Sequence, residues 1–109
     1  MTRELSSEAL EMIAGRFRIL GESIRLQLLN LLRDGEMSVS ELTTALEASQ
    51  PNVSKHLKLL AESGILRREQ RGNTVFYSIA DASIFQLCDV VCDSLSDRYR
   101  ERAALFVRA

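Results

Sequence analysis

The chain has 109 residues, 46% of them apolar and 27% charged, and a formal net charge of −1. This length supports one domain with one core, so we expect a single domain over residues 1–109, helped by a partner chain. The N-terminus lacks a basic segment leading into an apolar run, no stretch reaches the ~18 apolar residues of a membrane span, and two cysteines are too few for a secreted disulfide scaffold, so we expect a cytoplasmic protein without membrane contact.

The small net charge conceals an uneven distribution along the chain. Residues 49–79 hold five lysines and arginines against two acidic residues, a net charge of +3. Residues 1–48 and 80–109 carry net charges of −3 and −1. Because screened charges act over about 8–10 Å, a polyanion is expected to approach the middle third and to be repelled by the rest.

Two apolar helices are predicted at the start of the chain. Ser6 can cap a helix through about Leu20, in which apolar residues recur every three or four positions. A second helix is expected from about Glu22 to Arg33, ended by the glycine at position 35. The first helix can pack on its own core or on a second chain, and its pattern fits both.

The next segment has the pattern of a helix-turn-helix. Ser38 followed by Glu41 is a capping box that begins a short helix through Leu46. Ser49 then caps a longer helix, with proline in its first turn and Gly64 where a left-handed residue ends it. Two short helices joined by a turn of about three or four residues predict this motif.

The longer helix has one apolar and one polar side. An ordinary amphipathic surface helix has the same periodicity, so the pattern alone does not establish DNA recognition. Its polar side chains suit DNA, because short polar groups bond base edges and lysines meet phosphate. The candidate DNA contacts on this helix are Ser49, Gln50, Asn52, Ser54, Lys55, His56 and Lys58.

A β-hairpin is predicted directly after this helix. Leu66 to Arg71 and Thr74 to Ile79 are strand-like, and Gly72-Asn73 between them is a turn signal that requires positive φ. A hairpin in this place is a wing, whose arginines can hold phosphate or enter the minor groove. For any one of these arginines an equal alternative is that its charge only keeps a solvated edge strand from aggregating. The candidate DNA contacts on the wing are Arg67 and Arg71.

Asp81 can cap a last helix from about Ala82 to near Ala104, with an apolar stripe on one side. The predicted order is therefore four helices, two strands and a final helix. This order predicts a mainly α protein with a small β-hairpin, namely a winged helix-turn-helix with additional helices at both ends.

These residues resemble the ArsR-type (arsenical-resistance repressor) family of small dimeric winged-helix repressors over roughly residues 17–95. The resemblance rests most on residues 49–60, which read SQPNVSKHLKLL, and on Gly64, Leu66, Arg71-Gly72 and Tyr77 after them. It implies a homodimer formed through the first and last helices, with two recognition helices on a palindromic operator of double-stranded DNA. It also implies an inducer that lowers DNA affinity.

The metal sites known in this family are not intact in this sequence. Many metal-sensing members carry Cys-Val-Cys where this chain reads Ser38-Val39-Ser40, and serine is a poor ligand for soft ions. The histidine positions of the zinc-type members correspond to Ser83 and Ser94. The resemblance therefore implies neither of these two metal sites here.

Cys88 and Cys92 remain as a candidate inducer site, four residues apart on the last helix. Such residues have Cβ atoms about 5–6 Å apart, whereas a disulfide wants ~3.5–4.5 Å. A thiophilic metal or metalloid ion, or an added sulfur atom, spans that gap more easily. The alternative is that both are small buried core residues without chemistry.

An enzyme is not expected. The one histidine lies in the recognition helix, no glycine-rich phosphate loop is present, and no carboxylate pair stands in a predicted cleft. A winged-helix module that contacts only proteins remains open beside the DNA-binding repressor.

Overall fold

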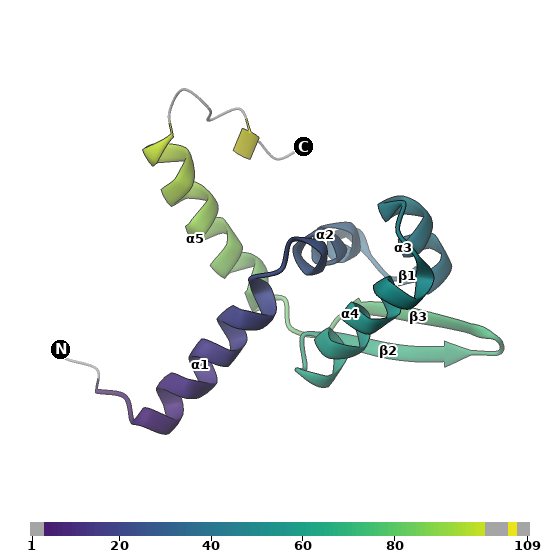
Figure 1. Cartoon of the computed structure of the whole chain (residues 1–109), viewed down its shortest axis with the longest axis horizontal. Helices are drawn as coiled ribbons and strands as arrows, with labels where there is room; N and C mark the ends of the chain where they lie inside the picture. The colour runs from purple at the N-terminus through teal and green to yellow at the C-terminus, as the bar shows by residue number, and fades with distance from the viewer. Residues whose placement is uncertain (1–3, 100–104, 107–109) are drawn as a thin grey trace.

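The computed structural model describes residues 4–99 and 105–106. Its order confirms the predicted winged helix-turn-helix, with one strand more than expected (Figure 1). The elements are α1 (Ser7–Leu20), α2 (Ser23–Leu31), the 3-10 turn η1 (Leu32–Asp34), β1 (Met37–Ser38), α3 (Val39–Leu46), α4 (Gln50–Glu62), β2 (Leu66–Arg71), β3 (Thr74–Ile79) and α5 (Ser83–Arg98).

The predicted helix starts at Ser6, Ser38 and Ser49 are confirmed. The Ser6 hydroxyl accepts a hydrogen bond from a backbone N–H of α1 at 3.1 Å. Ser38 accepts from the Glu41 N–H at 3.0 Å, and the Glu41 carboxylate accepts from the Ser38 N–H at 2.9 Å, so the capping box is complete. Ser49 accepts from the Asn52 N–H at 3.4 Å. These side chains satisfy amides that have no partner inside the helix.

The ends of two helices differ from the prediction. α2 ends at Leu31 and tightens into η1, because 3-10 turns are common where a helix stops. The last helix begins at Ser83 with Ala82 at its N-cap and no side-chain cap, so the predicted cap at Asp81 is wrong. Asp81 instead accepts from the hydroxyl and the N–H of Ser83, which lower the pKa of its carboxyl. α5 is described as far as Arg98, and the end predicted near Ala104 lies outside the described residues.

The sheet has three antiparallel strands in the order β1-β3-β2. β1 pairs Met37 with Tyr77, and at two residues it is too short to show a strand periodicity in the sequence. The hairpin has the predicted strands, with Arg71 opposite Thr74. Only Gly72, at φ +62°, takes the positive φ expected of both turn residues, as in a type II′ turn.

One core joins the helix-turn-helix to the sheet. Val53, Leu57 and Leu60 of α4 are fully buried, as their spacing predicts, and pack with Leu28 of α2 and Leu42 of α3. This burial fixes which side of α4 remains outside, because the side chains of one helical stripe face the core together.

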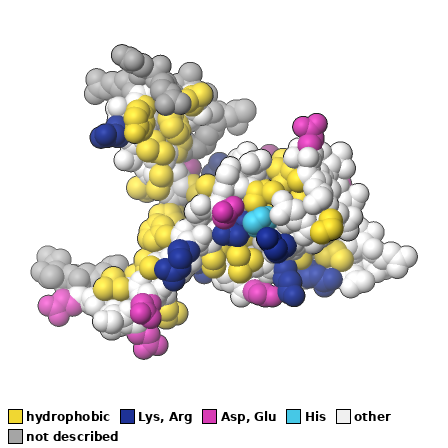
Figure 2. All heavy atoms as spheres, in the orientation of Figure 1, with side chains coloured by type: hydrophobic (Ala, Val, Ile, Leu, Met, Phe, Trp, Pro, Cys, Tyr) yellow, Lys and Arg dark blue, Asp and Glu magenta, His cyan; other side chains and the backbone are white. Residues whose placement is uncertain are grey.

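α1 and α5 diverge from this body on the side opposite the hairpin tip (Figure 1). Hydrophobic side chains are gathered on the outer surface of α5 and where α1 meets the body (Figure 2). In α1, Leu10, Ile13 and Phe17 are 52%, 42% and 51% exposed. Among the described residues, no helix combines the length and apolar character needed to cross a membrane.

Candidate nucleic-acid interface

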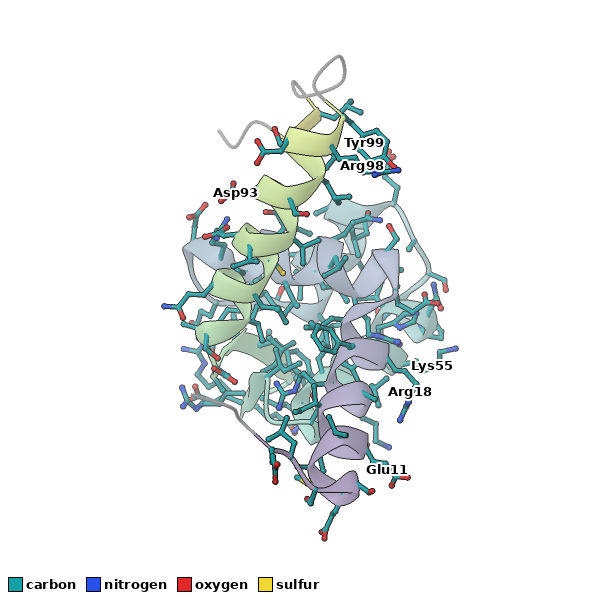
Figure 3. The ribbon with its side chains drawn as sticks, turned by 90° about the vertical axis from the view of Figure 1, so that its left-hand side faces the viewer. Glu11, Arg18, Lys55, Asp93, Arg98 and Tyr99 are labelled. Atoms are coloured by element: carbon teal, nitrogen blue, oxygen red, sulfur yellow. The ribbon has the colours of Figure 1, made fainter. Side chains whose placement is uncertain are left out.

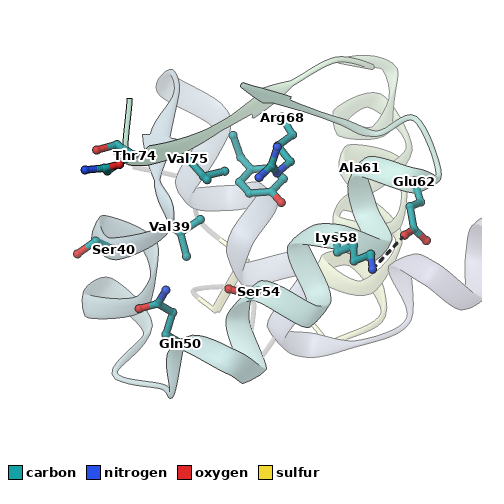
Figure 4. A pocket seen from close by; sticks show the side chains of 12 residues that line it. Val39, Ser40, Gln50, Ser54, Lys58, Ala61, Glu62, Arg68, Thr74 and Val75 are labelled. Carbon is teal, nitrogen blue, oxygen red and sulfur yellow. Dashed lines mark ion pairs between the residues drawn. The ribbon is translucent and has the colours of Figure 1, made fainter. Parts of the chain in front are cut away.

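A groove of about 800 Å³ lies between α4 and the β2–β3 hairpin, which we call the wing. Its floor and walls come from α3, α4 and the wing (Figure 4). The lining residues are Val39, Ser40, Gln50, Ser54, Lys58, Ala61, Glu62, Arg68, Asn73, Thr74, Val75 and Tyr77.

The α4 wall of the groove is polar and follows one helical line. Gln50, Ser54 and Lys58 recur every fourth residue and therefore lie along the same side of α4 (Figure 4). Glu62 continues this line, with its carboxylate 4.0 Å from the Lys58 ammonium. Three of the predicted contacts are thus brought together, beside the carboxylate of Glu62, which is not among the predicted contacts.

The wing wall carries Arg68, an arginine of the predicted wing that is not among the candidate contacts Arg67 and Arg71 (Figure 4). Arg68 pairs with Tyr77 across the hairpin, whereas Arg67 pairs with Ser78. Because successive strand residues point to opposite faces, only one of two adjacent arginines faces α4. The alternation along the strand predicts that Arg67 and Arg68 lie on opposite faces of the sheet. Which of the two arginines faces α4 depends on which face of the sheet packs against the helices.

Arg71 does not line the groove. Its guanidinium donates to the carboxylate of Glu36, the residue before β1, and lies 3.9 Å from the ring centroid of Phe76. The hydrogen bond to Glu36 raises the pKa of Arg71 above its usual value. The contact ties the end of β2 to the segment that enters α3, and its role toward DNA remains a prediction.

The other predicted contacts occupy different sides of α4. Asn52 and Lys55 are exposed but do not line the groove. Lys55 projects at the same edge of the molecule as Arg18 of α1 (Figure 3). Ser49, also exposed, is the N-cap of α4.

His56 is buried, with only 8% of its surface exposed. Its Nδ1 lies 3.1 Å from Nη1 of Arg25 on α2. Burial, and next the positive charge of Arg25, lower the pKa of His56 below 6.5. The structure therefore places His56 on the buried side of the recognition helix, near its middle, as a partner of α2.

The groove has the chemistry of a site for a polyanion. Lys58 of α4 and Arg68 of the wing place a cation on each wall of the groove. Gln50 and Ser54 add an amide and a hydroxyl to the α4 wall. Cations hold phosphate regardless of sequence, and amides and hydroxyls bond base edges.

Cys88 and Cys92 line a second, apolar hollow of about 360 Å³, together with Phe17 and Leu20 of α1. Both are half-buried, and neither forms a disulfide within the part of the chain that is described. The Cys92 sulfur lies 3.5 Å from the Phe106 carbonyl oxygen. Across the described residues, no group of three or more histidine, cysteine, aspartate or glutamate side chains is arranged to hold a metal ion.

The capped helix α4, the three-residue turn before it and the wing define a winged helix-turn-helix protein. The family model described as "Bacterial regulatory protein, arsR family" matches residues 22–68. A biofilm growth-associated repressor of Xylella fastidiosa is 33% identical over 91 residues, which cover 84% of this chain and 80% of that protein. The chain belongs to the ArsR family.

Two further relatives bear on assembly and ligands. The arsenical resistance operon repressor of Escherichia coli is 45% identical over 65 residues, covering 59% of this chain but only 56% of that protein's length. A solved domain from Mycobacterium bovis, described as a homodimeric winged helix-turn-helix DNA-binding domain, is 31% identical with a TM-score of 0.71, covering 85% of this chain and 91% of that one. These relatives are regulators, in agreement with the expectation that the chain is not an enzyme.

Proposed function

We propose that this protein is a sequence-specific DNA-binding transcriptional repressor that acts as a homodimer on a palindromic operator. The observation that carries the proposal is the groove, with Lys58 on the recognition helix and Arg68 on the wing. The exposed side of α4 enters the major groove, and the wing holds the adjacent backbone.

Dimerisation is supported by the apolar side chains that α1 and α5 leave exposed. Val91 and Leu95 of α5 are 47% and 37% exposed, beside the exposed stripe of α1. The M. bovis relative is described as homodimeric. A two-fold dimer presents two recognition helices about one duplex turn apart, roughly 34–36 Å, and therefore favours a palindromic site.

A gel-shift titration on DNA from upstream of the protein's own gene tests this function. We expect tight, salt-dependent binding to one segment and much weaker binding to a shuffled duplex of equal length. A Lys58→Ala, Arg68→Ala double variant is the matched control and should lose binding to the upstream segment and to the shuffled duplex. Equal, weak binding to both duplexes by the wild type would favour the alternative, a winged-helix module that contacts only proteins.

We further propose that Cys88 and Cys92 are the inducer site and take a thiophilic ion, or one bridging sulfur atom supplied by two persulfide molecules, which act as the oxidant and leave as two thiols and one hydrogen sulfide. Both thiols line the hollow between α1 and α5, one helical turn apart. Two thiols supply only half of the four ligands that zinc prefers, so the pair suits a two-sulfur bridge better than a complete zinc site. The name of the E. coli relative, an arsenical resistance repressor, makes trivalent arsenic a natural first ligand to test.

Such a bridge acts by favouring one arrangement of α5 against α1. A hundredfold loss of DNA affinity needs about 2.7 kcal/mol of coupling between the two sites. The test is a Cys88→Ser, Cys92→Ser double variant titrated with arsenite, zinc or a persulfide donor while operator binding is followed. If the wild type ignores all three ligands, or the variant responds equally, the cysteines are only structural.

A further inference from the structure

The side chain of Arg25, on α2, connects three helices. Its Nε donates to the carbonyl of Ile19 at 2.6 Å, and its Nη2 donates to the carbonyl of Arg18 at 3.4 Å. Both carbonyls belong to the last turn of α1, where the helix dipole is negative, and the Arg18 carbonyl also accepts from the Gly21 N–H at 3.3 Å. Its Nη1 lies 3.1 Å from Nδ1 of His56 on α4. One guanidinium therefore binds the end of α1 and the middle of the recognition helix at once.

The third contact requires a neutral histidine. A guanidinium has only donors, so Nδ1 of His56 must be the acceptor and the ring proton must lie on Nε2. His56 is 8% exposed and belongs to the buried side of α4 with Val53 and Leu60. At that position it cannot reach base edges, so its hydrogen bond to Arg25 is the interaction that the recognition helix gains from it.

We propose that Arg25 is a positioning residue that holds the recognition helix against α1 through neutral His56, and that protonation of His56 releases this contact and weakens operator binding. The inference rests on the proposed DNA binding and deepens it. Arg25 links α4, the helix proposed to read DNA, to α1, a helix proposed to form the dimer. The angle of α4 therefore depends on the position of α1.

The proton acts on this link by removing an acceptor. Protonated histidine has donors on both nitrogens, so it cannot accept from Arg25 and repels it. In the described residues, the charges that act on His56 are Arg25 of α2, Lys55 of α4 and Glu22 between α1 and α2. Burial and the two cations oppose protonation and Glu22 favours it, so the pKa of His56 lies below 6.5 and the link is closed at neutral pH.

The chain has one histidine, which makes the test direct. Operator affinity is measured between about pH 5 and pH 8 at constant ionic strength, while the histidine ring is titrated by NMR. We expect wild-type affinity to fall about tenfold as the ring becomes protonated, the effect of losing one hydrogen bond to a charged group. His56→Asn keeps an acceptor near the position of Nδ1 but does not titrate, so it should bind as the wild type does at pH 8 and remain flat.

Arg25→Gln and Arg18→Gln form a matched pair of arginine variants. Arg18 contributes only its carbonyl to the link, so Arg18→Gln should keep the pH profile whatever its effect on overall affinity. Arg25→Gln should bind weakly at every pH, and its histidine pKa should rise toward 6.5 because a cation has been removed. The ring titration needs no DNA and reports on the link separately.

The outcomes separate this inference from the proposed function. No preference for any operator at pH 8 would remove the function and the inference together. Three results would overturn the link alone. They are a wild-type operator affinity that does not change with pH, a wild-type affinity that rises at acid pH, and a loss of affinity at acid pH in His56→Asn that equals the loss in the wild type. An unchanged histidine pKa in Arg25→Gln would also overturn it.

Discussion

At the scale of single residues, the groove divides the polar side chains of α4 into two groups. Gln50, Ser54 and Lys58 face the wing, whereas Asn52 and Lys55 lie on other exposed sides. Hydroxyl and amide groups report base identity, while a lysine meets phosphate in any sequence. Loss of a hydroxyl or amide group should therefore weaken binding to a specific DNA sequence, whereas loss of a lysine should weaken binding to any DNA and reduce its salt dependence.

Replacing Ser54 or Asn52 by alanine is expected to cost ~1–3 kcal/mol on the operator and little on random DNA, because a contact to a base edge is lost. Lys58→Ala should weaken both complexes and lower the salt slope by about one. Fluorescence anisotropy titrations at several salt concentrations measure both effects. Ser94→Ala, on α5, is the control. Equal losses on both DNAs for Asn52→Ala would contradict its assignment.

Arg71 offers a second test at this scale. Because Glu36 holds its guanidinium, Glu36→Gln leaves a less neutralised cation at the end of β2. We expect tighter binding to operator and random DNA alike, by about threefold, with a steeper salt dependence. Filter binding at two salt concentrations checks this, with Glu11→Gln on α1 as the control. Weaker binding would instead mean that the pair serves chiefly to position the wing.

His56 also predicts how stability changes with pH. Its pKa is lowered in the folded chain from 6.5, so the unfolded chain binds the proton more readily. The contribution is fully present above about pH 6.5 and is lost as the pH falls through the lower folded-state value. Urea unfolding at about pH 7.5 and pH 5.5 should show a smaller loss for His56→Asn than for the wild type. An identical loss in both proteins would exclude this origin.

At the scale of elements, the helix-turn-helix is held at both helix starts by side chains close in sequence. Ser38 and Glu41 cap α3, and Ser49 caps α4 after a turn in which Glu47 takes φ +53°. Ser38 also belongs to β1 and pairs with Phe76. The first helix of the motif is therefore joined to the sheet at its N-cap.

Ser38→Ala is expected to lower the free energy of unfolding by about 1 kcal/mol, because the Glu41 N–H loses the acceptor that the buried Ser38 hydroxyl provides. Chemical denaturation of the purified protein measures this. Ser40→Ala, two residues later and inside α3, is the matched control and should be neutral or slightly stabilising. A similar loss in both variants would mean that the capping box contributes little.

At the scale of the whole molecule, the helix-turn-helix and sheet share one core, while α1 and α5 extend from it with exposed apolar sides (Figure 1). Large exposed apolar surfaces mark interaction sites, since water-exposed apolar area is costly. The same two helices border the hollow that contains both cysteines. The proposed dimer contact and the proposed inducer site therefore both lie on α1 and α5.

Phe17→Glu is expected to shift a dimer to a monomer, because it places a charge on the exposed stripe of α1. Sedimentation at micromolar concentration measures the state, and operator affinity should fall with it. Gln27→Glu adds the same charge at an exposed position of α2 and is the control. A monomeric wild type would contradict the proposed dimer and the operator geometry that follows from it.

The features that the sequence determined depend on residues that are neighbours in the chain. The side chains of Ser6, Ser38 and Ser49 each accept from the backbone N–H three residues further along the chain. The hairpin turn needs only Gly72 and its flanking strands. Short-range hydrogen bonds and a 3.6-residue period are visible in a linear pattern. The order of helices α1 to α5 and of the hairpin strands β2 and β3, and the choice of α4 as recognition helix, follow from them, whereas the two-residue β1 does not.

The features that only the tertiary structure decided depend on residues far apart in sequence. Arg25 meets His56 across 31 positions, and Arg71 meets Glu36 across 35. Arg68 rather than Arg67 faces the groove because of which side of the sheet packs against α4. No local period records such contacts, since the packing of one core determines which distant side chains meet. That packing turned His56 from a predicted DNA contact into the buried partner of Arg25.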